Sequence, residues 1–109
     1  MKDKISRKLQ LSFIRVHVLY HASKAAFYGA WMLEELASHG YDFGPSTIYP
    51  LLKEMTESKL LNVENIVSEG KLRKYYSITN EGLEILKLSI NQVVHLLEEI
   101  EGKHHEENL

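Results

Sequence analysis

The segment from residue 44 to residue 82 constrains the fold more than any other part of this chain, because a helix, a turn and a basic strand follow one another there. Gly44 and Pro45 form a helix start signal, since proline is tolerated at the first helical position, where its missing N–H costs nothing. Apolar residues at helical spacing then predict an inward face made of Ile48, Leu51, Leu52 and Met55. On or beside the opposite face lie Ser46, Thr47, Tyr49 and Lys53, all residue types that contact nucleic-acid grooves.

A hairpin follows this helix. The first strand contains Leu61, Val63 and Val67, and the turn contains Ser68, Glu69 and Gly70. The second strand, residues 71–78, carries three cations and no acid. Strand alternation predicts Lys71, Arg73 and Tyr75 on one face and Lys74, Tyr76 and Ile78 on the other, with Tyr76 and Ile78 toward the core. A basic hairpin beside a helix is typical of a winged helix that reads DNA.

Within this hairpin, we expect Lys71 and Arg73 to contact phosphate and Tyr75 to assist them. Lys74 is either near the twisted tip or lays its stem along apolar surface. On the preceding helix, Ser46 and Thr47 can bind phosphate or a base edge near the helix N-terminus. Tyr49 suits phosphate or a thymine methyl, and Lys53 suits phosphate or guanine.

Length and composition bound the class of protein. At 109 residues the chain predicts a single domain, residues 1–109, whose core would be marginal in one copy, so we expect an oligomer. The sequence has no cysteine, no signal-peptide pattern and no apolar run long enough for a membrane span. These features favour a cytoplasmic protein without a membrane partner. The net charge is −2, but the charges are unevenly distributed, with a basic hairpin and an acidic C-terminal part. DNA binding requires only a basic face.

Two helices flank the central segment. The first is expected from about Asp3 or Ser6 to His21, with a loop at residues 23–25, and it is apolar around most of its second half. The last, residues 79–102 with Thr79 as N-cap, carries a seam of about three heptads, formed by Leu83, Leu86, Ile90, Val93, Leu97 and Ile100. We expect this seam and Phe13 to form a homodimer interface; the alternative is that the seam packs on its own domain. Residues 103–109 are expected to be a frayed polar tail.

These elements predict a mainly α fold with a small β-hairpin. A winged helix-turn-helix would occupy about residues 9–78, preceded by an N-terminal helix and followed by a long C-terminal dimerisation helix. A second helix is expected to turn Trp31, Met32, Leu33, Leu36 and Ala37 inward until Gly40 ends it.

Two motifs, Pro-Ser-Thr-Ile-Tyr-Pro-Leu-Leu-Lys at 45–53 and Gly-Lys-Leu-Arg-Lys-Tyr-Tyr-Ser-Ile-Thr-Asn-Glu-Gly at 70–82, resemble the PadR family of bacterial and archaeal transcriptional regulators. Tyr28 and Gly29, which open a short apolar helix, fit the same pattern, and the resemblance covers roughly residues 13–86. Two positions depart from it: Lys59 stands where family members usually carry glycine, and Leu72 interrupts the basic run of the wing. A non-glycine residue in a left-handed helix C-cap would cost about 1 kcal/mol.

The resemblance implies a repressor that responds to a small aromatic or drug-like effector, which would bind at the dimer interface. The two-fold symmetry of the expected homodimer implies that its double-stranded DNA operator is palindromic. Phe13 and Trp31 are candidates for the effector pocket; core packing is the alternative for Trp31. One competing hypothesis is a winged helix that docks an acidic protein. Another is a small-molecule sensor whose DNA affinity is secondary.

The sequence favours no catalytic function, because no nucleophile, carboxylate pair or phosphate loop is arranged for one. We expect no cofactor. His17 and His21, four residues apart on one helix, have a spacing that can hold a metal, but the sequence shows no third ligand, so a structural or interfacial role is expected and no metal site is assigned. His104 and His105 could bind a metal adventitiously.

Overall fold

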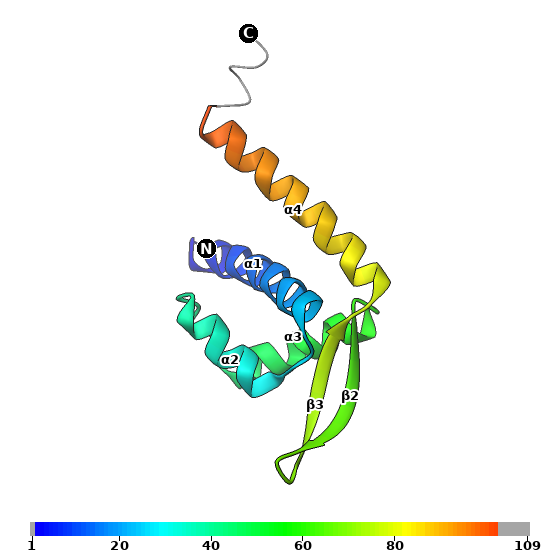
Figure 1. The fold of residues 1–109 in the computed structure, drawn as a ribbon. Coiled ribbons are helices and arrows are strands. Elements are labelled where there is room, and N and C mark those ends of the chain that lie inside the picture. The colour runs from blue at the N-terminus through cyan, green and yellow to red at the C-terminus, as the bar shows by residue number, and fades with distance from the viewer. Residues whose placement is uncertain (1, 103–109) are drawn as a thin grey trace.

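The computed structural model describes residues 2–102. Its elements are α1 (Lys2–Lys24), β1 (Phe27–Tyr28), α2 (Gly29–Ser38), α3 (Pro45–Glu57), β2 (Leu61–Ser68), β3 (Lys71–Ile78) and α4 (Asn80–Ile100). The predicted class, mainly α with a small β part, is confirmed. Figure 1 shows α4 leading away from the other helices, while the β2–β3 hairpin points to the opposite side. The tail predicted at residues 103–109 lies outside the described residues.

The small sheet has one strand more than the sequence suggested. Strand β3 lies in the centre, antiparallel to both β1 and β2. Tyr76 in β3 lies opposite Phe27 of β1 and Val63 of β2, and its ring stacks on that of Phe27 at 5.7 Å. Strand β1 was missed because two residues are too short for an alternating pattern to register.

The core is built inside the winged-helix part. Met32 and Leu36 of α2 meet Ile48 and Leu52 of α3, all fully or almost fully buried, and Ile14 and Val18 of α1 close the same cluster. The inward face predicted for α3 is thus confirmed. Trp31 and Ala37 differ from the expectation, because both are exposed; α2 has only ten residues and buries one narrow stripe.

Two helices end in the same motif with different residues. At the end of α2, Gly40 has φ +89° and the N–H of Tyr41 donates to the carbonyl of Leu36. At the end of α3, Lys59 has φ +63° and the N–H of Leu60 donates to the carbonyl of Met55. Lys59 therefore occupies the left-handed C-cap that the sequence predicted, in a conformation that glycine adopts without cost.

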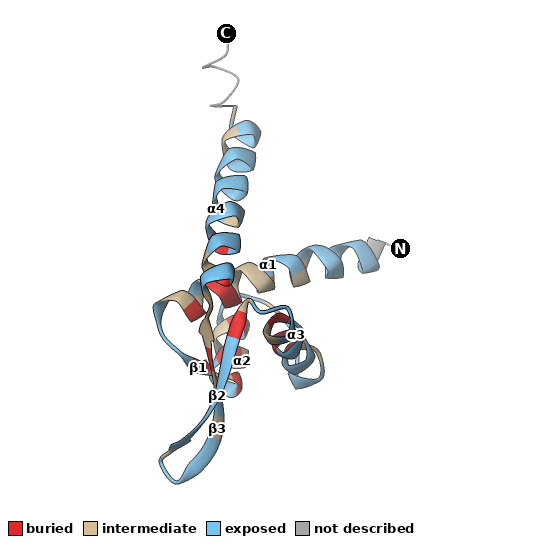
Figure 2. Cartoon of the chain, turned by 90° about the vertical axis from the view of Figure 1, so that its right-hand side faces the viewer, coloured by how far each residue is buried: buried red, intermediate tan, exposed pale blue. Residues whose placement is uncertain are grey.

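Figure 2 shows that most of α4 and the N-terminal half of α1 are exposed, and many of these exposed residues are large and apolar. Helix α1 is longer than predicted: Ser23 and Lys24 belong to it and not to a loop, because no helix-breaking residue stands before Lys24. Its exposed stripe includes Ile5, Leu9 and Phe13, four residues apart. Among the described residues, no helix is long and apolar enough to cross a membrane.

Candidate nucleic-acid interface

The outer face of α3 is polar and accessible. Ser46, Tyr49 and Lys53 are exposed, whereas Thr47 is half-buried. Pro45 occupies the first turn, and Gly44 precedes it as N-cap in extended conformation. Ser46 and Thr47 lie in the first turn, where the N–H of Thr47 donates to the carbonyl of Gly44 at 3.1 Å. The N–H of Ser46 and the positive end of the helix dipole can attract an anion there. This end of α3 is therefore suited to a phosphate.

A groove runs between α3, the start of α2 and the wing, which we define as the β2–β3 hairpin. Its volume is about 920 Å³. Four cations line it, against the single carboxylate of Glu57: they are Lys53, Lys71, Arg73 and Lys74. Tyr49 and Pro50 of α3 line it as well. The structure thus brings five of the eight predicted DNA-contacting residues into one groove; Ser46, Thr47 and Tyr75 lie outside its lining.

Two aromatic rings support the basic strand. The guanidinium of Arg73 lies over the ring of Tyr28, 4.2 Å from its centroid, and Tyr75 meets the same ring edge to face at 5.6 Å. Such a contact holds a cation in place without neutralising it. Tyr75 therefore acts first as a packing partner of Tyr28, and Arg73 presents a positioned charge beside the groove.

Tyr49 has a structural constraint that the sequence did not reveal. A Cβ atom built on Gly29 would overlap the Tyr49 ring, so glycine at the first residue of α2 allows this ring to pack against the helix start in its present position. Burial, and then the neighbouring Tyr49, raise the pKa of Tyr76, which keeps this phenol neutral. The Tyr49 ring, 42 % exposed, thus packs on α2 with one side and faces the groove with another.

The tip of the wing is a two-residue turn. Glu69 and Gly70 both have positive φ, at +52° and +76°, which is the geometry that matches the twist of a hairpin. Val67 and Leu72 face each other across the strands next to this turn and are 70 % and 69 % exposed. The cations of the wing therefore all lie on β3, where Leu72 interrupts their run between Lys71 and Arg73, whereas β2 carries Glu64.

Helix α1 adds a cation that sequence reasoning missed. Arg7 donates from Nη2 to the hydroxyl of Thr47 at 3.3 Å and lies 5.0 Å from the centroid of the Phe43 ring. Arg15 binds Glu54 of α3 through Nε and Nη2, at 3.1 and 2.8 Å. These contacts fix α3 against α1, and Arg7 adds positive charge at the α3 N-terminus. No sequence signal links Arg7 to α3, because the pair is forty residues apart.

The residues predicted for a dimer interface divide into two groups. Leu86 is buried in the core of its own chain and Leu83 packs against that core. The others are exposed: Phe13, Ile90, Val93, Leu97 and Ile100. Trp31, the other effector candidate, contacts His21 and Phe27 at ring distances of 5.4 and 6.0 Å. Neither the α3–wing groove nor a smaller hollow beside Asp3 and Phe43 is lined by Phe13 or Trp31.

Comparison with known proteins supplies the family. The model of the transcriptional regulator PadR-like family matches residues 18–88. The transcriptional regulator Rv3488 of Mycobacterium tuberculosis is 34 % identical over 96 residues, covering 88 % of this chain and 90 % of the relative. A PadR family transcriptional regulator from Eggerthella lenta has a similar structure, with 30 % identity, a TM-score of 0.74 and coverage of 95 % of this chain and 91 % of that one.

A PadR-like transcriptional regulator from Bacillus cereus is 33 % identical, with a TM-score of 0.70 and coverage of 82 % of this chain and 91 % of that one. The names of the relatives describe regulators of transcription and not enzymes. The matched residues 18–88 include α2, α3 and the whole wing. This chain therefore belongs to the PadR-like family of transcriptional regulators.

Proposed function

We propose that this regulator is a homodimer that binds a palindromic operator through α3 and the wing and represses transcription. The observation that carries the proposal is the α3–wing groove, in which Lys53 from the helix and Lys71, Arg73 and Lys74 from the strand face one space. A positively charged concave surface beside an exposed helix matches a DNA backbone next to a major groove.

Within this proposal the residues have different tasks. Ser46, Thr47, Tyr49 and Lys53 stand on the helix that would enter the major groove, so sequence preference would depend on them. Lys71, Arg73 and Lys74 would bind phosphates of the flanking backbone, which gives affinity with little sequence information. Arg7 would add a phosphate contact at the start of α3.

Two-fold symmetry follows from the exposed seam of α4. Pairing of two chains through α4 and the Phe13 stripe of α1 would bury apolar residues that one chain leaves in water. Two copies of α3 would then reach successive major grooves, about 34–36 Å apart on the same side of the duplex. The operator would accordingly be palindromic, with half-sites about one helical turn apart.

The proposal also includes control of DNA binding by a small-molecule effector. A small aromatic or drug-like compound bound at the dimer interface, beside Phe13 or Trp31, would favour one separation of the two α3 helices over another. The compound would act only through its different affinities for the two dimer conformations, which differ in the separation of the α3 helices. Arg15–Glu54 and Arg7–Thr47 would transmit such a change, because both join α1 to α3.

Binding to DNA from immediately upstream of the protein's own gene tests the proposal. Fluorescence anisotropy with a labelled fragment, unlabelled competitor DNA and a salt series should show binding that survives competitor and weakens steeply with salt. A promoter fusion would then show lower expression when the protein is present. Weak binding that any competitor abolishes equally would contradict specific recognition.

The exposed tip of the wing favours one alternative. Val67 and Leu72 together form an apolar spot that a protein partner could cover. A docking module would bind an acidic protein through Lys71 and Arg73 and would bind DNA without sequence preference. The competitor experiment separates the two functions, because only the DNA reader discriminates between its operator and unrelated DNA.

A further inference from the structure

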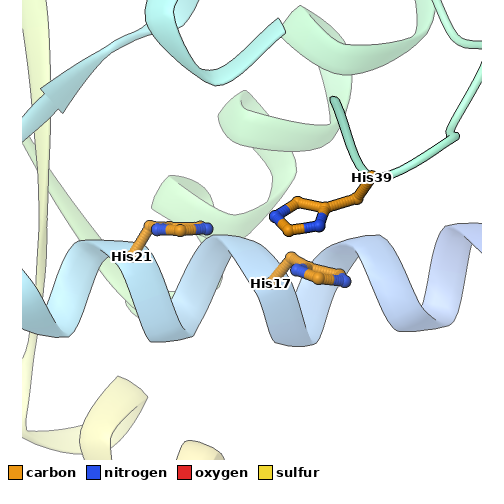
Figure 3. A group of neighbouring side chains, drawn as sticks. All are labelled: His17, His21 and His39. Carbon is orange, nitrogen blue, oxygen red and sulfur yellow. The ribbon is translucent and has the colours of Figure 1, made fainter. Parts of the chain in front are cut away.

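Three histidine side chains, two from α1 and one from the residue that follows α2, gather on one side of α1, as Figure 3 shows. His17 and His21 stand one turn apart on α1, and His39 follows the last turn of α2. One ring nitrogen of each lies within 4.8 Å of one nitrogen of each of the others. His39 is thus the third imidazole that the sequence did not reveal, since it lies in another element.

A carboxylate joins this cluster. Oε1 of Glu35 is 3.1 Å from Nε2 of His39 and 3.4 Å from Nε2 of His21. Around a tetrahedral zinc ion with bonds of about 2.0–2.1 Å, neighbouring ligand atoms stand roughly 3.3–3.4 Å apart. The contact with His39 is a hydrogen bond, and both distances are also close to those of atoms that share one ion, so Glu35 can either orient an imidazole ligand or bind the ion itself.

The surroundings of His17 favour the form of imidazole that can bind a metal. Burial, and then the neighbouring His39 and His21, lower the pKa of His17, while Glu35 opposes the shift. Neutral imidazole is the ligand form of histidine. Around the cluster lie the rings of Tyr41, against His17 at 5.3 Å, and Trp31, against His21 at 5.4 Å, and they limit solvent on two sides.

We propose that His17, His21, His39 and Glu35 form a binding site for one divalent transition-metal ion of the Zn²⁺ type. Imidazole nitrogens select zinc, nickel, cobalt or copper over magnesium and calcium, which prefer oxygen. The nitrogens, which lie within 4.8 Å of one another, have to draw together by up to about 1.4 Å to reach the separations of ligands on one ion. The His39 side chain is 45 % exposed and stands at a helix end, so its ring can turn inward at little cost.

The position of the site suggests what an ion would change. His17 and His21 lie on α1, which also carries Phe13 and the contacts to α3. His39 lies immediately before the turn, residues 40–44, that leads into α3. A bound ion would tie the end of α2 to α1 at this turn. An effect of the ion on DNA binding rests on the proposed function, whereas binding of the ion does not.

Calorimetric titration of the full-length, untagged chain with ZnCl₂ tests the site. All proteins compared would carry His104→Ala and His105→Ala, because adjacent tail histidines can bind an ion on their own. We expect one ion per chain, and His39→Ala should weaken its affinity by at least about 100-fold because a direct ligand is lost. Glu35→Gln, which keeps a hydrogen-bond acceptor, should weaken it by about tenfold.

His95→Ala, which removes a histidine of α4 outside the cluster, serves as the matched control and should leave the affinity unchanged. Circular dichroism of the metal-free variants checks that each is folded. Equal zinc affinity in the His39→Ala, Glu35→Gln and parent proteins would overturn the proposal and leave the cluster as a hydrogen-bonded contact between α1 and α2.

A second readout needs no cluster variant. Trp31 is the only tryptophan, and its ring meets that of His21 edge to face. One equivalent of Cu²⁺ should quench its fluorescence, and the quenching should saturate at that ratio and be reversed by excess ZnCl₂. Unchanged fluorescence at one equivalent, or quenching that rises without saturation, would contradict a site at this place.

Discussion

Most apolar residues of α3, in the winged-helix part, are buried, whereas most of those of α4 are exposed. In α3, the apolar residues at helical spacing are all buried within the chain. In α4, of its large apolar residues only Leu86 is buried, and the exposed ones are Ile85, Leu88, Ile90, Val93, Val94, Leu96, Leu97 and Ile100. Both helices are amphipathic in sequence, so the pattern alone does not say what an apolar face packs against. The first face is completed inside one chain, whereas the second is exposed in one chain and is the face that we propose to pair with a second copy.

A short joint connects these two regions. Thr79 caps α4 by accepting a hydrogen bond from the N–H of Gly82 at 2.9 Å, and its hydroxyl donates to the carbonyl of Lys59 at 2.6 Å. A Cβ atom on Gly82 would overlap the carbonyl oxygen of Leu60, so the start of α4 lies directly on the end of α3. The direction of α4 is therefore set by the same residues that end α3.

The largest expected effect comes from breaking the α4 seam. Leu97→Asp places a charge on the predicted dimer face, where burial would cost too much for the pair to form. Sedimentation should show a monomer at concentrations where the parent is a dimer. Operator affinity should fall by about 100-fold or more, because two linked half-site contacts become one.

Leu88→Asp is the matched control for this change. Leu88 and Leu97 are 53 % and 52 % exposed, but their spacing puts them on opposite sides of α4. The comparison predicts that Leu88→Asp leaves the dimer intact. If both variants were monomeric, or neither, the dimer would not use this seam, and the contrast between α4 and the winged-helix part would need another explanation.

A smaller effect is expected in the wing. Arg73→Gln removes a charge positioned over Tyr28 and should weaken DNA binding about tenfold at low salt, because a charged hydrogen bond to phosphate is lost. The slope of the logarithm of the affinity against the logarithm of the salt concentration should become shallower by about one unit for each subunit. Binding isotherms at several salt concentrations measure both quantities.

Lys87→Gln provides the control, since it removes the same charge from α4, away from the wing. It should leave the salt slope unchanged while keeping the dimer. An unchanged slope in Arg73→Gln would exclude Arg73 from the interface and weaken the assignment of the groove to DNA.

Much of the fold could be predicted because it depends on local patterns. The start of α3 at Pro45, its inward face, the turn at Glu69 and Gly70, and the Thr79 cap each follow from residues within a few positions of one another. Strand β1 could not be predicted, because two residues carry no periodicity and their pairing with β3 is formed across the fold.

The parts of the site that escaped prediction all join distant elements. Arg7 reaches Thr47 from α1, and His39 reaches His17 from the end of α2. The spacing of residues in the sequence identifies neighbours on one helix face, such as His17 and His21. It does not identify residues that tertiary packing brings together. Tyr49 illustrates the same limit: its place on the outer face was predicted, and its contact with Gly29 was not.

The smallest effect is expected at the joint between the two regions, at Lys59. Its φ of +63° repeats the motif that Gly40 forms at the end of α2 with φ +89°, so Lys59→Gly should relieve strain and raise the free energy of unfolding by about 1 kcal/mol. Gly40→Ala should lower it by a similar amount, and since a Cβ on Gly40 meets nothing within 4 Å, the loss would report backbone strain alone. Chemical denaturation at one protein concentration measures both. If Lys59→Gly instead destabilised the protein, the lysine side chain would contribute more to the start of α4 than its backbone costs, and the joint would depend on that side chain as well as on the Thr79 cap.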